Sequence, residues 1–441
     1  MPFRKFFGRG NGGTPEPPTE APDVEEEGDE ELAPEEALDA DAIDQGWRQR
    51  AGDVIPGGSS TGSKRPEALY GPGSEEGPGH FTSASGCRVV TASGRTLIDC
   101  TMALGSVAIG YGDDAIARAV VGAVAGGHVS GLASTLEVEV AERLCDIIPC
   151  AEQVRFFKSG ADAVSAAVRI ARAATGRTRV IGSGYFGWHD WWNAGRGIPE
   201  GAHADFTPLP FDDVVALERA GREAGSSLAA VVLEPVQGRL PSAEWITAAR
   251  RICDEAGAVL VFDEMKTGFR LAPGGYQEYA GVVPDLATFG KAMANGFPLA
   301  ATVGRAGVME ALRDTWVSST LAGESLSLAA VGAVLDVYEE VAVCDTLWRV
   351  GAEMRQRVGE ALLASGAPGA TIGGIDLMWS IDFDDAAFQT RFLHRAVALG
   401  VLFKRGAWNF AAVAHDDEQT ILTIERVAST ALVELMEEDA R

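Results

Sequence analysis

The chain has 441 residues, of which 46% are hydrophobic, and its formal net charge is -26. This is the composition of a globular protein with a substantial core, and its acidity disfavours binding to nucleic acid, whose phosphates it would repel. No apolar run reaches the roughly 18–20 residues of a membrane helix, and the first ten residues do not read as a secretory signal, so we expect a cytoplasmic protein outside the membrane.

The chain begins with an acidic segment. Residues 1–46 carry a net charge of -11, because fourteen acidic residues lie between Glu16 and Asp44 and only three basic residues precede them. A segment so rich in Pro, Glu and Gly cannot bury enough apolar surface to order itself. We therefore expect residues 1–46 to be a disordered tail.

The rest of the sequence predicts two domains. Residues 106–335 form a large domain in which helical patterns alternate with short apolar runs, namely VRFF, TRVI, LAAVVLEPV, AVLVFDE, LATF and AATVG. This alternation is typical of an α/β fold with a mainly parallel sheet. Residues 47–105, with a hairpin at GCRVVTASGRTLIDC, and residues 336–441 would together form a smaller α+β domain.

Two short motifs suggest functions that their surroundings contradict. GSSTG contains Ser60 in the GxSxG pattern of a nucleophile elbow, but no buried strand precedes it and no helix follows. GSGYFG, residues 182–187, has the GxGxxG pattern of a dinucleotide loop, but no helix begins inside it, and the residues around Asp205 do not resemble the end of a second buried strand. An NAD-dependent oxidoreductase is therefore the last of the hypotheses.

Metal chemistry has little support in the sequence. The six histidines show no HxxxH or HxxC spacing, and the six cysteines include no CxxC pair. The sequence thus predicts no metal site and reduced, mostly buried thiols. His189, next to Asp190, is expected to be a hydrogen-bonded loop residue; the alternative is that it faces the substrate, because it closely follows Tyr185.

Two acidic residues follow strands that we expect to be neighbours. Glu234 ends the run LAAVVLE, Asp263 ends AVLVFD, and the segment between them has the spacing of a helix. Parallel strands present their carboxyl ends, where ligands bind, at one edge of the sheet. Both carboxylates should therefore reach that edge.

A helix start and a lysine complete the set. Ser159, Gly160 and Ala161 begin a helix directly after the run VRFF, and a helix N-terminus is an anion site as well as a capped end. Lys291 follows LATF between two glycines and precedes apolar residues that would lower its pKa. A strand-end aspartate, a lysine and an anion-binding helix start are the parts of a pyridoxal phosphate site.

Several segments resemble one family. VVLEPVQG, VFDEMKTGFR, PDLATFGKAMANGFPLAATVG and STLAGESLSLAA are similar in order and spacing to the class III aminotransferases, which have pyridoxal phosphate fold type I with a seven-stranded-type sheet in the large domain. VIPGGSSTG, MALGSVAIGYG and VAHDDEQ resemble the relatives of glutamate-1-semialdehyde 2,1-aminomutase. The resemblance covers roughly residues 50–435.

The resemblance implies a role for each residue that matches a family motif. Lys291 would form the Schiff base and carry the proton, Asp263 would hold the pyridine nitrogen, and the cofactor would also contact Ser159, Gly160, Ala161, Tyr185, Phe186, Glu234 and Met265. Tyr185 would stack on the cofactor ring. Thr320 would reach the phosphate of a neighbouring subunit, so the resemblance implies a homodimer.

The sequence departs from the family pattern at several of these positions. Ala161 lacks the usual threonine hydroxyl, Phe186 replaces a histidine, and Met265 stands where Val or Ile is common. Lys266 replaces Gln, Met or Val and is a rival for the Schiff base without the strand-then-glycine setting. The segment 187–208 is shorter than the gating loop of the true aminomutases.

These features leave three functions to compare. The first is an aminotransferase that moves an amino group from a small-molecule donor to a carbonyl acceptor; the second is an aminomutase of the same family; the third is a non-catalytic scaffold. For the substrate, the sequence offers Trp188, Trp191 and Trp192 as an apolar or sugar-binding wall and Arg270, Lys404 or Arg405 as partners for an anionic group. Burial of the tryptophans at a domain or dimer interface is an equally good interpretation.

Overall fold

In the computed structural model, which describes residues 39–74 and 76–441, a seven-stranded sheet supports the predicted site. The strands in sheet order are β4 (Gln153–Phe157), β10 (Ala300–Gly304), β9 (Leu286–Phe289), β8 (Val259–Asp263), β7 (Leu228–Leu233), β5 (Arg179–Ser183) and β6 (Phe206–Pro208). In this described sheet only β10 runs antiparallel to its neighbours. The predicted α/β class is confirmed, and each of the six apolar runs forms a strand.

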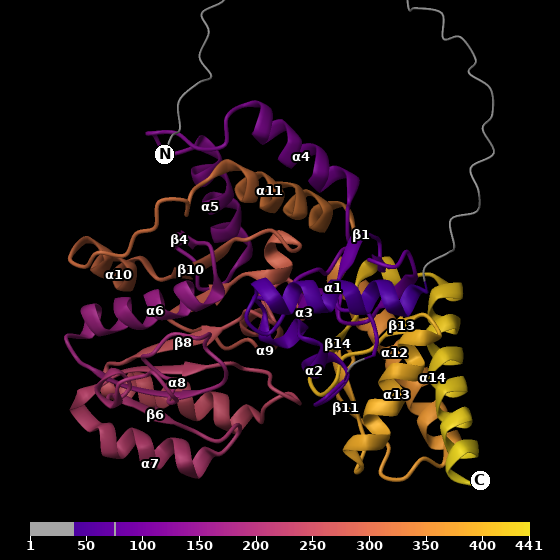
Figure 1. The fold of residues 1–441 in the computed structure, drawn as a ribbon. Coiled ribbons are helices and arrows are strands. Elements are labelled where there is room, and N and C mark those ends of the chain that lie inside the picture. Colours follow the sequence, from indigo (N-terminus) through magenta and orange to yellow (C-terminus); the bar gives the residue numbers. More distant parts are fainter. Residues whose placement is uncertain (1–38, 75) are drawn as a thin grey trace, which may run out of the picture. The chain divides into compact units, whose positions relative to one another are not determined.

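Helices cover both faces of the sheet because each strand is apolar on both sides. Val232 and Val261 point to one face, where they pack with the apolar stripe of α6 (Gly160–Thr175). Their neighbours Val231 and Leu260 point to the opposite face, which α7 (Val214–Ala224) and α8 (Ala243–Ala256) cover. Figure 1 shows the sheet between α6 and α7. This alternation with a period of two residues is what buries a parallel strand on both sides.

The edge strand β6 was not predicted. It has three residues and pairs in parallel with β5, directly after Asp205. Its backbone continues the sheet although Pro208 removes one donor, which an edge strand tolerates. No helix begins inside residues 182–187, and the segment before β6 contains only a 3-10 turn at Glu200–Ala202, so the structure agrees with the rejection of the dinucleotide motif.

Two smaller sheets join segments from both ends of the chain. One contains β1 (Phe81–Ser85), β2 (Arg88–Thr91), β3 (Thr96–Asp99) and β13 (Val401–Leu402); the other contains β11 (Thr371–Ile375), β12 (Met378–Asp382) and β14 (Asn409–Phe410). The predicted hairpin is confirmed, since β2 and β3 pair antiparallel. The parallel pairing of β13 with β3 connects residues about three hundred positions apart. The domain boundaries at 105 and 335 stay a prediction.

Eleven further α-helices lie in the described part of the chain. They are α1 (Ala40–Val54), α2 (Pro66–Leu69), the single turn α3 (Met102–Gly105), α4 (Asp114–Ala125), α5 (Thr135–Ile147), α9 (Tyr276–Ala280), α10 (Ala306–Met309), α11 (Ser325–Glu340), α12 (Val343–Ser365), α13 (Ala386–Ala398) and α14 (Glu418–Asp439). Long helices α12 and α14 lie side by side (Figure 1). Within the described ranges we find no helix with the length and apolar character to cross a bilayer.

The predicted boundary of the acidic tail is wrong. Residues 40–46, assigned to the tail from their charge, form the beginning of α1. Asp44 is buried there, and its carboxylate accepts hydrogen bonds from Ser93 and Arg95. A charge that has such partners can be buried, which a charge count does not reveal. The rest of the predicted tail, residues 1–38, lies outside the described residues.

Candidate active site

The residues selected from the sequence converge on one edge of the large sheet. Glu234 follows β7, Asp263 ends β8, and Lys291 follows β9 after one glycine. Tyr185 follows β5, and α6 begins just after β4. Because these strands run in the same direction, their carboxyl ends meet at one edge, the usual place for a ligand in such sheets.

Asp263 is held rigidly at that edge. It is 3% exposed, and its Oδ1 accepts hydrogen bonds from the Met265 N–H at 3.0 Å and the Thr288 hydroxyl at 3.2 Å. Neither bond uses Oδ2. Burial, and next the nearby charge of Glu234, raise the pKa of Asp263 above its usual range. The aspartate is therefore positioned to share a proton with a basic nitrogen.

Lys291 begins a short 3-10 turn, η4 (Lys291–Ala294), with a left-handed φ of +48°. Its side chain is partly exposed although the next three residues are buried. Burial of the ammonium, and next the like charge of Lys266, lower the pKa of Lys291 to about 8. A lysine with such a pKa has a usable fraction of neutral, nucleophilic amine near neutral pH.

Asn295 holds the turn of Lys291 in place and was not identified from the sequence. Its Oδ1 accepts from the N–H groups of Ala108 and Ile109, and its Nδ2 donates to the Gly110 carbonyl at 2.9 Å. Asn295 itself has a φ of +44°, a conformation that asparagine tolerates. An Asn-Gly pair directly after the lysine segment is the signal that could have indicated it.

The start of α6 has the geometry of an anion site. Ser159 caps the helix: its hydroxyl accepts from the Asp162 N–H at 3.2 Å and donates to the Asp162 carboxylate at 2.7 Å. Gly160 has no room for a side chain, since a Cβ there would lie 2.8 Å from the sulfur of Met265. The N–H groups at positions 160 and 161 precede the first helical hydrogen bonds and stay available to an anion.

The small residue at Ala161 has a structural reason. A Cβ on Gly187 would lie 2.4 Å from the Cβ of Ala161, so the loop after Tyr185 passes directly over the first turn of α6. A threonine at position 161 would add two atoms at a place where the backbone of Gly187 lies close. The departure from the family pattern thus follows from the path of that loop.

The aromatic segment 185–192 divides into two groups. Tyr185 and Trp188 are 67% and 72% exposed, whereas Phe186 is 1% exposed and packs with Trp191, Trp192 and Phe206. The indole N–H groups of Trp191 and Trp192 donate to the Ser165 hydroxyl and the Gly187 carbonyl. The expectation that Phe186 contacts the cofactor is therefore wrong, because its ring is buried in the core. Trp191 and Trp192 are half-buried and pack against that ring, so their contact with a substrate stays a prediction.

His189 is a hydrogen-bonded loop residue, as expected. Its Nδ1 lies 2.6 Å from the Ser165 hydroxyl and its Nε2 lies 3.6 Å from a carboxylate oxygen of Asp162. These contacts connect the loop to the first turns of α6.

The three basic residues proposed for an anionic substrate group have structural roles. Arg270 is fully buried and donates to the carbonyls of Gly105 and Ala411. Lys404 is buried and donates to the carbonyls of Ala68 and Arg405, while Arg405 donates to Tyr70 and Thr390. Arg270 and Lys404 are buried against backbone carbonyls, so the substrate role predicted for them is wrong. Arg405 is half-buried and makes both contacts through one nitrogen, so its role stays a prediction.

Lys266 forms the site's closest ion pair. Its Nζ lies 2.5 Å from Oε1 of Glu234 and 5.9 Å from the ring centre of Trp408. The other oxygen of Glu234 accepts from the Tyr185 N–H at 3.2 Å. Glu234 thus links the ends of β5 and β8 through its two oxygens.

Thr320 lies in an exposed segment between α10 and α11. It lines a cavity of about 350 Å³ together with the loop 127–134. Next to this segment, Lys158 donates to Glu324, the residue that caps α11, at 2.6 Å. This ion pair ties the segment to the residue before Ser159.

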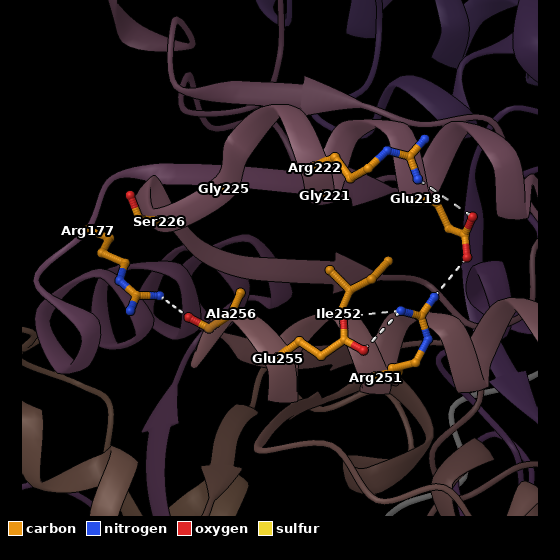
Figure 2. A pocket seen from close by; sticks show the side chains of 10 residues that line it. All are labelled: Arg177, Glu218, Gly221, Arg222, Gly225, Ser226, Arg251, Ile252, Glu255 and Ala256. Carbon is orange, nitrogen blue, oxygen red and sulfur yellow. Dashed lines mark hydrogen bonds and ion pairs between the residues drawn. The ribbon is translucent and has the colours of Figure 1, made fainter.

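A second cavity, of about 530 Å³, lies at the other end of the strands between α7 and α8 (Figure 2). Its arginines already have partners: Arg177 donates to the carbonyls of Leu228 and Ala256, and Arg251 pairs with Glu218 and Glu255 (Figure 2). None is free to bind a ligand, so this cavity is no candidate site. Among residues 39–74 and 76–441 no group of three His, Cys, Asp or Glu side chains could hold a metal ion.

Comparison with known proteins gives consistent matches. The family model described as aminotransferase class-III matches residues 70–189 and 208–413. The 3-aminobutyryl-CoA aminotransferase of Cloacimonas acidaminovorans (strain Evry) is 30% identical over 394 residues, which cover 86% of this chain and 94% of that protein. The 2'-deamino-2'-hydroxyneamine transaminase of Streptomyces kanamyceticus is 36% identical over 363 residues, 80% of this chain and 91% of that one.

A solved structure extends the comparison to the fold. The FumI protein of Sphingopyxis sp. MTA144, in its PLP internal aldimine form, superposes with a TM-score of 0.85 at 27% identity and covers 90% of this chain and 98% of its own. The gap in the family match, residues 190–207, contains Trp191, Trp192 and the loop before β6. The family model therefore does not match this loop.

Proposed function

The chain belongs to the class III aminotransferases and is a pyridoxal 5'-phosphate-dependent enzyme, and from that premise we propose that Lys291 is the amine that binds the cofactor. The enzyme takes a small-molecule amino donor and a carbonyl acceptor. The observation that supports Lys291 is the shared sheet edge, which brings this lysine, Asp263 and the start of α6 to one place.

The residues present fit the cofactor's three chemical parts. The aldehyde needs a nucleophilic amine, and Lys291 has a lowered pKa. The pyridine nitrogen needs an acid behind it, and Oδ2 of Asp263 is the carboxylate oxygen that neither the Met265 nor the Thr288 hydrogen bond uses. The phosphate needs N–H donors, which Ser159, Gly160 and Ala161 would supply at the positive end of α6.

The protein's own groups then have distinct tasks. When bound, the cofactor supplies an electron sink for the carbon that carries the amino group. Asp263 keeps the ring nitrogen protonated, because a buried carboxylate beside that nitrogen stabilises its positive charge. Lys291 takes the proton from the substrate carbon and later gives it back, which completes the transfer of the amino group. Met265 and Tyr185 would flank the ring, since Met265 lies against Gly160 and Gly290 and Tyr185 has an exposed ring.

We further propose a homodimer in which Thr320 contacts the cofactor phosphate of the partner subunit. Exposed apolar side chains occur on α4, the loop 127–134, α5 and the segment before α11; they are Val121, Val124, Val129, Leu132, Val138, Trp316 and Leu321. Leu132 and Trp316 are 84% and 83% exposed. Exposed apolar groups in contiguous elements are typical of a protein interface. A cytoplasmic location stays a prediction, which the six unpaired cysteines favour.

The dimer has a direct test. Leu132→Asp combined with Trp316→Ser should shift sedimentation of the full chain from dimer to monomer and speed the loss of cofactor. Val215→Asp, which places a charge at an equally exposed valine on α7, is the matched control and should leave the dimer intact. If both proteins sediment alike, this surface is not the interface.

The reaction is tested with a panel of amino donors. Without an acceptor, the enzyme should convert one equivalent of donor per active site and then stop until a carbonyl acceptor is added. Asp263→Asn should slow this half-reaction by at least about a hundredfold, while the exposed Asp254→Asn should not. Continuous turnover of a single substrate into an isomer would support the aminomutase alternative, which no structural observation favours.

A further inference from the structure

The site contains two lysines, and only one of them can be the amine that the cofactor aldehyde modifies. We propose that the ion pair with Glu234 makes this choice: Glu234 holds Lys266 as an ammonium and so directs the aldehyde to Lys291. This inference rests on the proposed role of Lys291 and adds what keeps the second amine from reacting.

The contacts of Lys266 favour its charged form. Its Nζ lies 2.5 Å from Oε1 of Glu234, and the face of Trp408 lies on another side at 5.9 Å. Glu234 is buried, and the Tyr185 N–H fixes its second oxygen, so the carboxylate cannot turn away without losing a hydrogen bond. A carboxylate and an aromatic face both stabilise an ammonium.

The surroundings of Lys291 are different. Within the described part of the chain, no carboxylate lies within ion-pair distance of its Nζ. The charged groups that act on it from the neighbouring elements are Lys266, Asp263, Glu234 and Arg270, and the like charge of Lys266 opposes protonation. The ion pair with Glu234 stabilises the Lys266 ammonium. Burial and the charge of Lys266 lower the pKa of Lys291, while the charges of Asp263 and Glu234 act in the opposite direction.

The chemical consequence follows from the lone pair. A neutral amine attacks the aldehyde carbon, a carbon–nitrogen double bond forms, and the aldehyde oxygen leaves as water with both amine hydrogens. An ammonium has no lone pair and cannot begin this step. Without Glu234, Lys266 would stand at the same sheet edge, directly after Met265, with no carboxylate to stabilise its ammonium.

The test traps the link with borohydride and locates it by peptide mass spectrometry. The wild-type holoenzyme should have the reduced cofactor on Lys291 alone. Lys291→Ala incubated with pyridoxal 5'-phosphate should have almost none, whereas Lys291→Ala with Glu234→Gln should have at least about tenfold more, on Lys266, because the carboxylate that stabilises the ammonium is gone. The glutamine keeps an oxygen for the Tyr185 N–H. Adding Lys266→Met should abolish the label.

The outcomes separate the two proposals. If the wild-type label is not on Lys291, the proposed function is wrong. If the wild-type label is on Lys291 but the double variant, folded by circular dichroism, stays unlabelled, the role of Glu234 is wrong. A second measurement needs no variant: trace acetylation of the full-length apoprotein should label Lys291 faster than Lys266, and equal labelling would overturn the proposal.

Discussion

Gly187→Ala tests how the loop with Tyr185 is held against the start of α6. The φ of Gly187 is +85°, and a Cβ there would lie 2.4 Å from the Cβ of Ala161 and 2.8 Å from its Cα. The second of these atoms is backbone and cannot move unless α6 moves. We expect the free energy of unfolding to fall by about 2–5 kcal/mol, with about 1–2 kcal/mol from the left-handed backbone and about 1–3 kcal/mol from overpacking.

The assay is urea denaturation of the full chain, followed by far-ultraviolet circular dichroism. Two glycines of the same loop separate the contributions. Gly197 has a φ of +93° and no atom within 4 Å of an added Cβ, so Gly197→Ala should cost only the backbone part. Gly195 has neither a left-handed φ nor a close neighbour, and Gly195→Ala should cost little.

A double substitution locates the contact. Ala161→Gly removes the Cβ at 2.4 Å but keeps the Cα at 2.8 Å, so it should recover part of the overpacking cost of Gly187→Ala and none of the backbone cost. If Gly187→Ala is no more destabilising than Gly197→Ala, the close approach of the loop to α6 is not what the glycine serves.

Three further predictions concern Arg270, Asn295 and Lys291. Arg270→Met should lower the free energy of unfolding by about 3 kcal/mol or more, because two buried carbonyls lose their donors; a change in donor KM with unchanged urea stability would contradict this. Asn295→Asp should cost about 1–3 kcal/mol in the same assay, since it removes the donor to the Gly110 carbonyl; an unchanged midpoint would show that this bond is dispensable. Cofactor uptake by the apoprotein should speed up about tenfold per pH unit and level off above about pH 8, as Lys291 loses its proton. Lys266→Met removes a like charge, so it should raise the pKa of Lys291 and move this midpoint to higher pH; a midpoint that stays or falls would refute the coupling.

The strands and the main site residues could be predicted because their signals are local. A parallel strand buried on both faces is a short continuous apolar run, and the polar residue after it must reach the ligand edge. Asp263 and Lys291 both follow from this rule. The capped start of α6 follows from Ser159 and Asp162 alone.

The errors concern residues whose roles depend on distant partners. Asp44 appeared to belong to the acidic tail because its partner Arg95 lies fifty residues away. Arg270 appeared available to a substrate because its acceptors, Gly105 and Ala411, lie in remote segments. The burial of the Phe186 ring was missed because it packs on Phe206 of β6, and β6 was not recognised as a strand.

The ion pair of Lys266 and Glu234 also depends on a partner that is distant in the sequence. The sequence shows a lysine where the family has an uncharged residue, but not that a carboxylate from the neighbouring strand neutralises it. Such pairs follow from strand order, which was itself predictable here only in part.

The most direct test of the central claim is a spectroscopic titration of the purified holoenzyme with amino donors, with Lys291→Ala as the control. We predict that donors change the absorption of the bound cofactor in a saturable way, that a carbonyl acceptor reverses the change, and that Lys291→Ala shows neither the starting spectrum nor the response. If Lys291→Ala has the wild-type spectrum and the wild-type response, Lys291 is not the amine that carries the cofactor.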